Sequence, residues 1–141
     1  MKWNYLKKTE EQLKNWYSNK KNSKKVEIDF EDFKSFKEWY NEKDKICFYC
    51  GLSEEISQKI VHNGLLKSNR FPLNGKISRG VNRGYWLEID RKNPKGNYSF
   101  ENCELCCYFC NNDKSDVFGE IQYKEFITDR IGFLNRLAKF H

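Results

Sequence analysis

The chain has 141 residues, of which 38% are hydrophobic and 33% charged, so it is long enough for one domain but not for two of ordinary size. No stretch approaches the roughly 18 apolar residues that span a membrane, and the first residues form no apolar leader, so we expect a soluble protein of the reducing cytosol. The formal net charge of +6 is concentrated in residues 1–25 and 62–96, which suggests a polyanionic partner, although solvated protein faces explain the same pattern.

Two amphipathic helices are predicted near the N-terminus. Apolar residues recur at helical spacing over residues 3–20, with lysines on the opposite side. A polar linker follows at 19–25, and Asp29 is an expected N-cap for a second helix over about 30–42. The apolar stripe of this second helix consists of Phe30, Phe33, Phe36 and Trp39. Such a stripe is typical of core packing rather than of a ligand site.

The middle of the chain alternates turns with short elements. The sequence from Cys47 to Gly51 predicts a tight knuckle, and residues 53–62 predict a short helix. Residues 65–84 are irregular and rich in glycine, so basic side chains such as Arg79 and Arg83 can approach phosphates there. An ordinary variable surface loop is an equally good interpretation of this segment.

The last third of the sequence predicts two strands followed by helices. Residues 85–90 and 101–106 have the composition of strands, with a turn at 93–97 between them. A helix is expected from Cys110 to about residue 117. A further apolar stripe predicts a C-terminal helix over residues 121–140.

The cysteines indicate a metal site. In a cytosolic chain, paired C-x-x-C units indicate metal binding rather than disulfides, and zinc prefers four tetrahedral ligands. A redox role for C-x-x-C would need a βαβ context, which the predicted elements lack. The six cysteines form one upstream pair and two tandem downstream pairs: Cys47 and Cys50, then Cys103 and Cys106, and Cys107 and Cys110.

Three pairs compete for one four-ligand site. Residues three apart in a strand point to opposite faces, so Cys103 and Cys106 cannot both reach one ion. Cys107 and Cys110 flank a strand-to-helix turn, where a knuckle fits. The predicted zinc ligands are therefore Cys47, Cys50, Cys107 and Cys110. Cys103 and Cys106 are then expected to be small buried hydrophobic residues.

A second set of residues suits a hard cation. Asp90 ends the first predicted strand, and Asn111 begins the helix after the last cysteine. Their oxygen atoms can hold a divalent ion and leave coordination positions for water and a phosphate.

At these positions the sequence resembles the HNH, or ββα-metal, endonucleases. The family pattern is an acid and a histidine at the end of a strand, a central Asn, and then C-x-x-C-N-x-x-K. The matching residues are Asp90, Asn102, Cys107, Cys110, Asn111 and Lys114. The segment Tyr98 to Asn102 is similar to a branch that includes rare-cutting restriction enzymes, in which an arginine replaces the histidine.

The resemblance covers about residues 45–118 and implies the fold. We expect an α+β protein with a small zinc-stapled ββα-metal (His-Me finger) core and flanking α-helices. The expected division is an N-terminal helical region at 1–44, the nuclease core at 45–118 and a C-terminal helix packed on it at 119–141.

The resemblance also implies roles for single residues. Asp90 and Asn111 would hold one Mg²⁺ or Mn²⁺ against the scissile phosphate, and zinc would be structural. Asn102 would brace the loop, and Lys114 would lie near a phosphate. Contacts with DNA are expected from four further basic residues, namely Arg79, Arg83, Lys92 and Lys95.

Arg91 stands where the family has its histidine, and three interpretations remain open. An arginine is a poor base and a good phosphate clamp. Another group, such as His62, Tyr85 or Tyr98, can act as the base. Alternatively, water or hydroxide attacks while Arg91 stabilises the phosphate, or the site only binds DNA.

The leading functional hypothesis is a metal-dependent DNA endonuclease of the restriction, homing or phage type. Its expected partner is double-stranded DNA in the cytoplasm of a bacterial or phage-infected cell, and a homodimer would supply two cuts. The rival hypotheses are a catalytically silent zinc-stapled DNA-binding module and a zinc-containing protein adaptor. The adaptor predicts no salt-dependent DNA binding.

Overall fold

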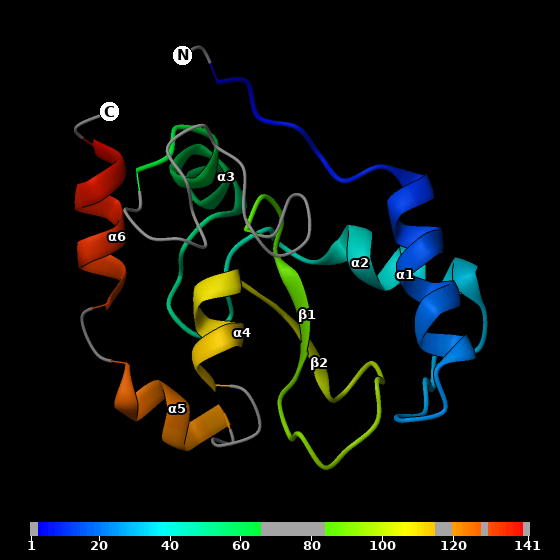
Figure 1. The fold of residues 1–141 in the computed structure, drawn as a ribbon. Helices are drawn as coiled ribbons and strands as arrows, with labels where there is room; N and C mark the ends of the chain where they lie inside the picture. The colour runs from blue at the N-terminus through cyan, green and yellow to red at the C-terminus, as the bar shows by residue number, and fades with distance from the viewer. Residues whose placement is uncertain (1–2, 66–83, 115–119, 128–129, 140–141) are drawn as a thin grey trace.

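The computed structural model describes residues 3–65, 84–114, 120–127 and 130–139 of the chain. This part of the chain forms a mixture of helices and a small sheet, as expected for an α+β protein (Figure 1). The elements are α1 (Glu10–Asn22), α2 (Phe33–Glu42), α3 (Glu54–His62), β1 (Glu88–Arg91), β2 (Cys103–Cys106), α4 (Tyr108–Lys114), α5 (Glu120–Phe126) and α6 (Arg130–Lys139). Among these described helices, none combines the length and the apolar character that crossing a membrane requires.

The sheet places a strand end, a loop and a helix start close together. β1 and β2 are antiparallel, with Glu88 opposite Cys106 and Arg91 opposite Cys103. α4 follows β2 almost directly and contacts β1. In Figure 1 the sheet lies between α1 and α2 on one side and α4, α5 and α6 on the other. The strands and α4 together have the ββα order that the sequence predicts.

One large buried apolar cluster connects all of these elements. Each helix and strand contributes at least one side chain to it. One contribution from each element, in chain order, is Leu13, Phe36, Ile60, Ile89, Leu105, Cys110, Tyr123 and Leu134. The N-terminal and C-terminal segments therefore pack on the same core as the sheet, and their description as three separate regions stays a prediction.

The first helix is shorter than the predicted range of 3–20. Thr9 and Gln12 form a capping box, in which each side chain accepts a hydrogen bond from the backbone N–H of the other, so α1 begins at Glu10. The preceding residues form no helix, and the backbone of Leu6 is hydrogen-bonded to the Gln58 side chain of α3. The helical spacing of apolar residues before Thr9 was therefore misleading.

The second helix also begins later than predicted. Asp32, rather than Asp29, caps it by accepting a hydrogen bond from the backbone N–H of Ser35 at 2.8 Å. Phe30 precedes the helix and is still buried. The short helix predicted at 53–62 is confirmed, because Ser53 caps α3 through the N–H of Ile56.

The C-terminal stripe forms two helices, α5 and α6, instead of one. Tyr123 and Ile127 at the first helix, and Leu134 and Ala138 in the second, all reach the buried cluster. A periodic apolar pattern cannot distinguish one helix from two that face the same core, which is why the prediction was wrong here.

The loop between β1 and β2 is fixed by the segment that joins α1 to α2. Ile28 and Tyr98 form an isolated parallel bridge. In it the Asp29 N–H donates to the Tyr98 carbonyl at 2.7 Å, and the Tyr98 N–H donates to the Glu27 carbonyl at 3.0 Å. This bridge brings the N-terminal region against the loop that follows Asp90.

Candidate active site and metal centre

Two turns bring the four predicted zinc ligands together. In the first turn, Gly51 has a φ of +82° and its N–H donates to the Cys47 carbonyl at 3.0 Å, a left-handed conformation that suits glycine. The N–H of Phe48 donates to the Leu105 carbonyl at 2.9 Å, which docks this turn on β2. The second turn leads from Cys107 into α4, next to β2.

The resulting cluster has the geometry of a Cys₄ metal site. The sulfur atoms of Cys47, Cys50, Cys107 and Cys110 all lie within 4.8 Å of one another, and those of Cys50 and Cys107 are 3.8 Å apart. In a tetrahedral zinc site with Zn–S bonds of about 2.3 Å, the sulfur atoms are about 3.8 Å apart. The four thiols are therefore placed to hold one structural metal ion such as zinc.

Cys103 and Cys106 lie outside this cluster, as predicted. Both are on β2 and completely buried, and neither joins the group of four thiols. Burial raises the pKa of the Cys103 thiol to about 12. Its thiol is therefore neutral at ordinary pH and behaves as a small core side chain.

Asp90 lies on β1 with its side chain nearly buried, at 7% exposure. Its carboxylate accepts a hydrogen bond from the Tyr49 hydroxyl, and Lys114 Nζ lies 3.4 Å from Oδ1 and 3.3 Å from Oδ2. Burial raises the pKa of the Asp90 carboxyl, whereas Tyr49 and Lys114 oppose the shift. A carboxylate has about four acceptor positions, so these donors leave capacity for a further ligand.

Lys114 is buried next to Asp90, and the place near a phosphate that the resemblance implied stays a prediction. Its side chain is completely buried, and its ammonium also donates to the Arg91 carbonyl at 3.1 Å. The ammonium therefore points at Asp90 and is placed to hold its carboxylate in position. Lys114 has this position because α4 begins at Tyr108 and packs on β1, so that Lys114 lies in the last turn of the helix, next to the strand.

We expect Lys114→Met to lower the free energy of unfolding by about 3 kcal/mol in the absence of divalent cations, because it leaves the buried Asp90 carboxylate without a compensating charge. Urea denaturation followed by circular dichroism measures the loss. The matched control is Lys37→Met, which removes an exposed ion pair with Glu10 of 2.7 Å and should leave the free energy of unfolding almost unchanged. Equal losses in the two variants would contradict the positioning role.

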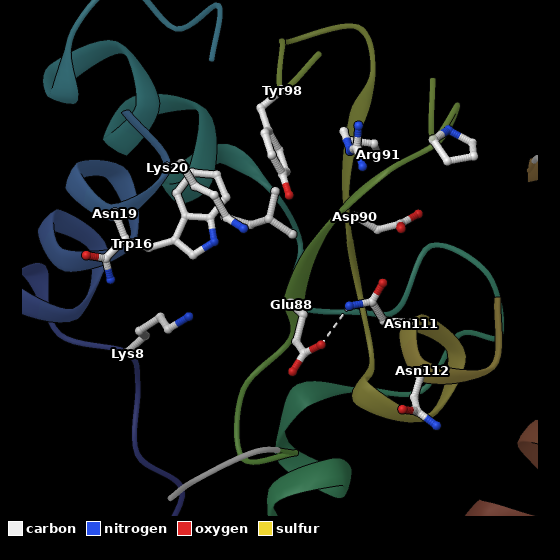
Figure 2. A pocket seen from close by; sticks show the side chains of 12 residues that line it. Lys8, Trp16, Asn19, Lys20, Glu88, Asp90, Arg91, Tyr98, Asn111 and Asn112 are labelled. Carbon is white, nitrogen blue, oxygen red and sulfur yellow. Dashed lines mark hydrogen bonds between the residues drawn. The ribbon is translucent and has the colours of Figure 1, made fainter. Parts of the chain in front are cut away.

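Asn111 lies in the middle of α4, beside a carboxylate that the sequence reasoning missed. Its side-chain nitrogen donates to Glu88 Oε1 at 2.7 Å. Figure 2 shows the Asn111 nitrogen directed at Glu88 and its oxygen turned toward Asp90. Glu88 precedes Asp90 by two residues on a strand, so both side chains lie on one face of it, and this spacing was visible in the sequence.

Asn102 holds the loop between the strands. Its Oδ1 accepts from the Asn93 N–H at 2.9 Å, and its Nδ2 donates to the carbonyls of Asn93 and Asn97 at 3.1 and 2.9 Å. A Cβ at Gly96 would lie only 2.7 Å from Asn102 Nδ2, so this contact requires glycine. These are the hydrogen bonds of a bracing residue, and any part for Asn102 in a reaction stays a prediction.

Arg91 belongs to the same loop structure and faces Tyr98. Its guanidinium donates to the Gly96 carbonyl at 2.9 Å and lies 5.3 Å from the centre of the Tyr98 ring. The ammonium of Lys20, from α1, lies 5.0 Å from the centre of the same ring. Two cations therefore flank Tyr98 at the edge of the site.

The side chains of Asp90, Arg91 and Asn111 line the same pocket, which has a volume of about 670 Å³. β1 and α4 supply one wall, which contains Glu88, Asp90, Arg91 and Asn111 (Figure 2). The N-terminal segment and α1 supply the other wall with Lys8, Trp16, Asn19 and Lys20, and Tyr98 also lines the pocket. The sequence did not indicate these α1 residues as part of a site, because only the fold brings them opposite Asp90.

Of the three groups considered as a base, Tyr98 alone is among the described residues that line this pocket. His62 Nδ1 and the Tyr85 hydroxyl are hydrogen-bonded to each other at 2.7 Å, and neither lines it.

The four predicted DNA contacts have different outcomes. Arg79 and Arg83 lie outside the described residues. Lys95 is exposed on a hollow next to the main pocket, whereas the ammonium of Lys92 lies 5.8 Å from the centre of the Phe48 ring and lines no described hollow. Of these residues, Lys95 alone is placed beside the candidate site in the described structure.

No protein-family model matches the chain, and no curated protein matches it in sequence. Among solved structures, the chain is similar to PacI, which is described as a rare-cutting HNH restriction endonuclease that perturbs DNA. The TM-score is 0.66 at 22% sequence identity, and the match covers 88% of this chain and 78% of the other. The resemblance to the HNH endonucleases is therefore confirmed at the level of the fold.

Proposed function

We propose that this protein is a metal-dependent DNA endonuclease of the HNH type, which hydrolyses phosphodiester bonds at the pocket around Asp90. The observation that carries the proposal is the convergence of Asp90, Asn111 and Arg91 on one pocket, next to a Cys₄ cluster. The similarity to an HNH restriction endonuclease over most of the chain supports it.

We propose zinc for the Cys₄ cluster and Mg²⁺ or Mn²⁺ for the pocket. The donor set fits the second ion, since a carboxylate and an amide oxygen from Asp90 and Asn111 face the same space. A divalent cation there would act as a Lewis acid on the scissile phosphate and neutralise charge on the leaving oxygen.

The residues around these two ligands have distinct tasks in the proposed reaction. Lys114 fixes Asp90 from behind, and Glu88 fixes the amide of Asn111. Arg91 binds the phosphate as a cation that cannot accept a proton at neutral pH. Tyr98 is assigned as the proton acceptor, because it lines the pocket between two cations. Its phenolate form would take the proton from the attacking water and become the neutral hydroxyl.

The experiment that tests the proposal is cleavage of supercoiled plasmid by the purified protein with Mg²⁺ or Mn²⁺. We expect nicked or linear product, and none in the presence of EDTA. Binding of DNA without cleavage under every divalent metal would overturn the nuclease proposal and support the silent DNA-binding module, for which the replacement of histidine by Arg91 is the specific argument.

Restriction-type cutting is the finer form of the proposal, suggested by the description of the similar structure. One site of this kind cuts one strand, so a double-strand break requires two copies of the chain. Sedimentation of the protein with and without duplex DNA tests this, and a monomer in both conditions would contradict it.

Glu88 provides a test of how the cation ligands are oriented. We expect Glu88→Ala to weaken Mn²⁺ binding about tenfold or more, because the Asn111 amide loses the acceptor that turns its oxygen to the pocket. Glu88→Gln keeps an acceptor oxygen and should restore most of the affinity. Isothermal titration with Mn²⁺ measures the affinity of both variants. If Glu88→Gln and Glu88→Ala weaken Mn²⁺ binding equally, Glu88 is itself a ligand of the cation.

A further inference from the structure

α1 is held rigidly against the candidate active site. Trp16 stacks on the buried Phe36 of α2, with 4.8 Å between ring centres, and meets Tyr98 edge-on at 5.4 Å. Lys20, one turn further along α1, lies over the rings of both Trp16 and Tyr98. The second wall of the pocket therefore has a fixed position relative to Asp90.

The hollow around Asp90 continues past Arg91 along this wall. Arg91 and Pro94 line both the main pocket and a second hollow of about 580 Å³. The second hollow shares Lys24 with a third, of about 360 Å³, at the end of α1. We call the second and third hollows together the basic groove beyond Arg91, and this groove meets the main pocket at Arg91 and Pro94.

The charge of this groove is almost entirely positive. The second and third hollows are lined by one carboxylate, Glu27, and by six cations. These cations are Arg91 and the groove lysines Lys20, Lys21, Lys24, Lys25 and Lys95. In the described part of the chain, no ion pair uses a groove lysine; the lysines that do form ion pairs lie elsewhere. Lysines that gather along a depression, without an ion pair to a described residue, favour a linear polyanion.

We propose that the basic groove holds the phosphate backbone of the DNA strand on one side of the scissile phosphate. This inference rests on the proposed nuclease function and extends it to α1 and the segment after it, outside the ββα core. The groove is continuous with the pocket through Arg91, so one strand can occupy both. Lysine contacts with phosphate position the strand and carry no sequence information.

The test measures how DNA binding by the full chain depends on salt. The variants are Lys24→Gln with Lys25→Gln, and the matched control Lys34→Gln with Lys139→Gln, which removes the same charge from exposed positions outside the described hollows. Fluorescence anisotropy with a labelled 30-base-pair duplex, in Ca²⁺ to limit cleavage, gives the slope of log K against log salt. The slope is measured for the wild-type chain and both double variants, each with this duplex and with a second duplex of unrelated sequence.

We expect the Lys24/Lys25 variant to reduce the magnitude of the slope by about 2, because each lost phosphate contact contributes about 0.9. The control variant should keep the wild-type slope. In the Lys24/Lys25 variant, the reduction of the slope should be equal on both duplexes. An unchanged slope in the Lys24/Lys25 variant, or an equal change in the control variant, would overturn the proposal that the groove binds DNA.

Plasmid cleavage by the wild-type chain separates the two proposals. Salt-dependent binding that weakens in the Lys24/Lys25 variant, without any cleavage, supports the groove and overturns the nuclease. Cleavage together with an unchanged slope overturns the groove alone.

Discussion

Replacement of Cys110 by serine is expected to abolish the cooperative folding of this protein at room temperature. The proposed zinc site joins the Cys47–Gly51 turn to the junction of β2 and α4, so losing one thiolate releases both. Structural zinc contributes about 10–16 kcal/mol in small zinc domains, which is as large as the 5–15 kcal/mol typical of total stability.

Cys103→Ala is the matched control for this expectation. Cys103 is also completely buried, but its thiol lies outside the cluster, so its loss should cost only about 1 kcal/mol. Near-ultraviolet circular dichroism, thermal melting and metal analysis of the purified variants measure the difference. A Cys110→Ser protein that keeps its metal and melts like the wild type would contradict a four-thiolate staple.

Replacement of Asp90 by asparagine is expected to lower the rate of DNA cleavage by about 1,000-fold or more. The substitution keeps the shape and an acceptor for the Tyr49 hydroxyl, but it removes the only anionic ligand proposed for the catalytic cation. A factor of 1,000 corresponds to about 4 kcal/mol of transition-state stabilisation. Single-turnover cleavage at saturating Mg²⁺ measures this change without contributions from product release.

The control variant is Glu104→Gln. Glu104 lies directly opposite Asp90 on β2, forms an ion pair with Lys43 at 3.0 Å and does not line the pocket. Its cleavage rate should stay within a few-fold of the wild type. DNA binding in Ca²⁺ and the melting temperature establish that Asp90→Asn is folded, and wild-type cleavage by a folded Asp90→Asn protein would place the chemistry elsewhere.

The choice of zinc ligands could be made from sequence because it depends on local geometry. Strand alternation separates Cys103 from Cys106, and a strand-to-helix turn joins Cys107 to Cys110, and the structure agrees on both. The capping box at Thr9 and the strand spacing of Glu88 were also visible in the sequence, but apolar periodicity and the family pattern were given more weight.

The positions of Lys114 and α1 could not be derived in this way. A helix lysine next to a phosphate site and one buried behind an aspartate have the same spacing in sequence, and they differ only in how α4 packs on β1. The wall containing Trp16 and Lys20 depends on the Ile28–Tyr98 bridge, which joins residues 70 positions apart. Such contacts are determined by tertiary packing, to which a single sequence gives little access.

The Cys₄ cluster has a consequence for the orientation of α4. Each residue of an α-helix advances by about 100° around its axis, so the angular positions of all residues on a short helix are fixed once one of them is anchored. Cys110 is such an anchor, and on the same helix Asn111 follows it by one residue and Lys114 by just over one turn. A metal ion bound by the cluster would thus fix the rotation of α4 about its axis. It would also fix the directions in which Asn111, the proposed cation ligand, and Lys114, the partner of Asp90, point.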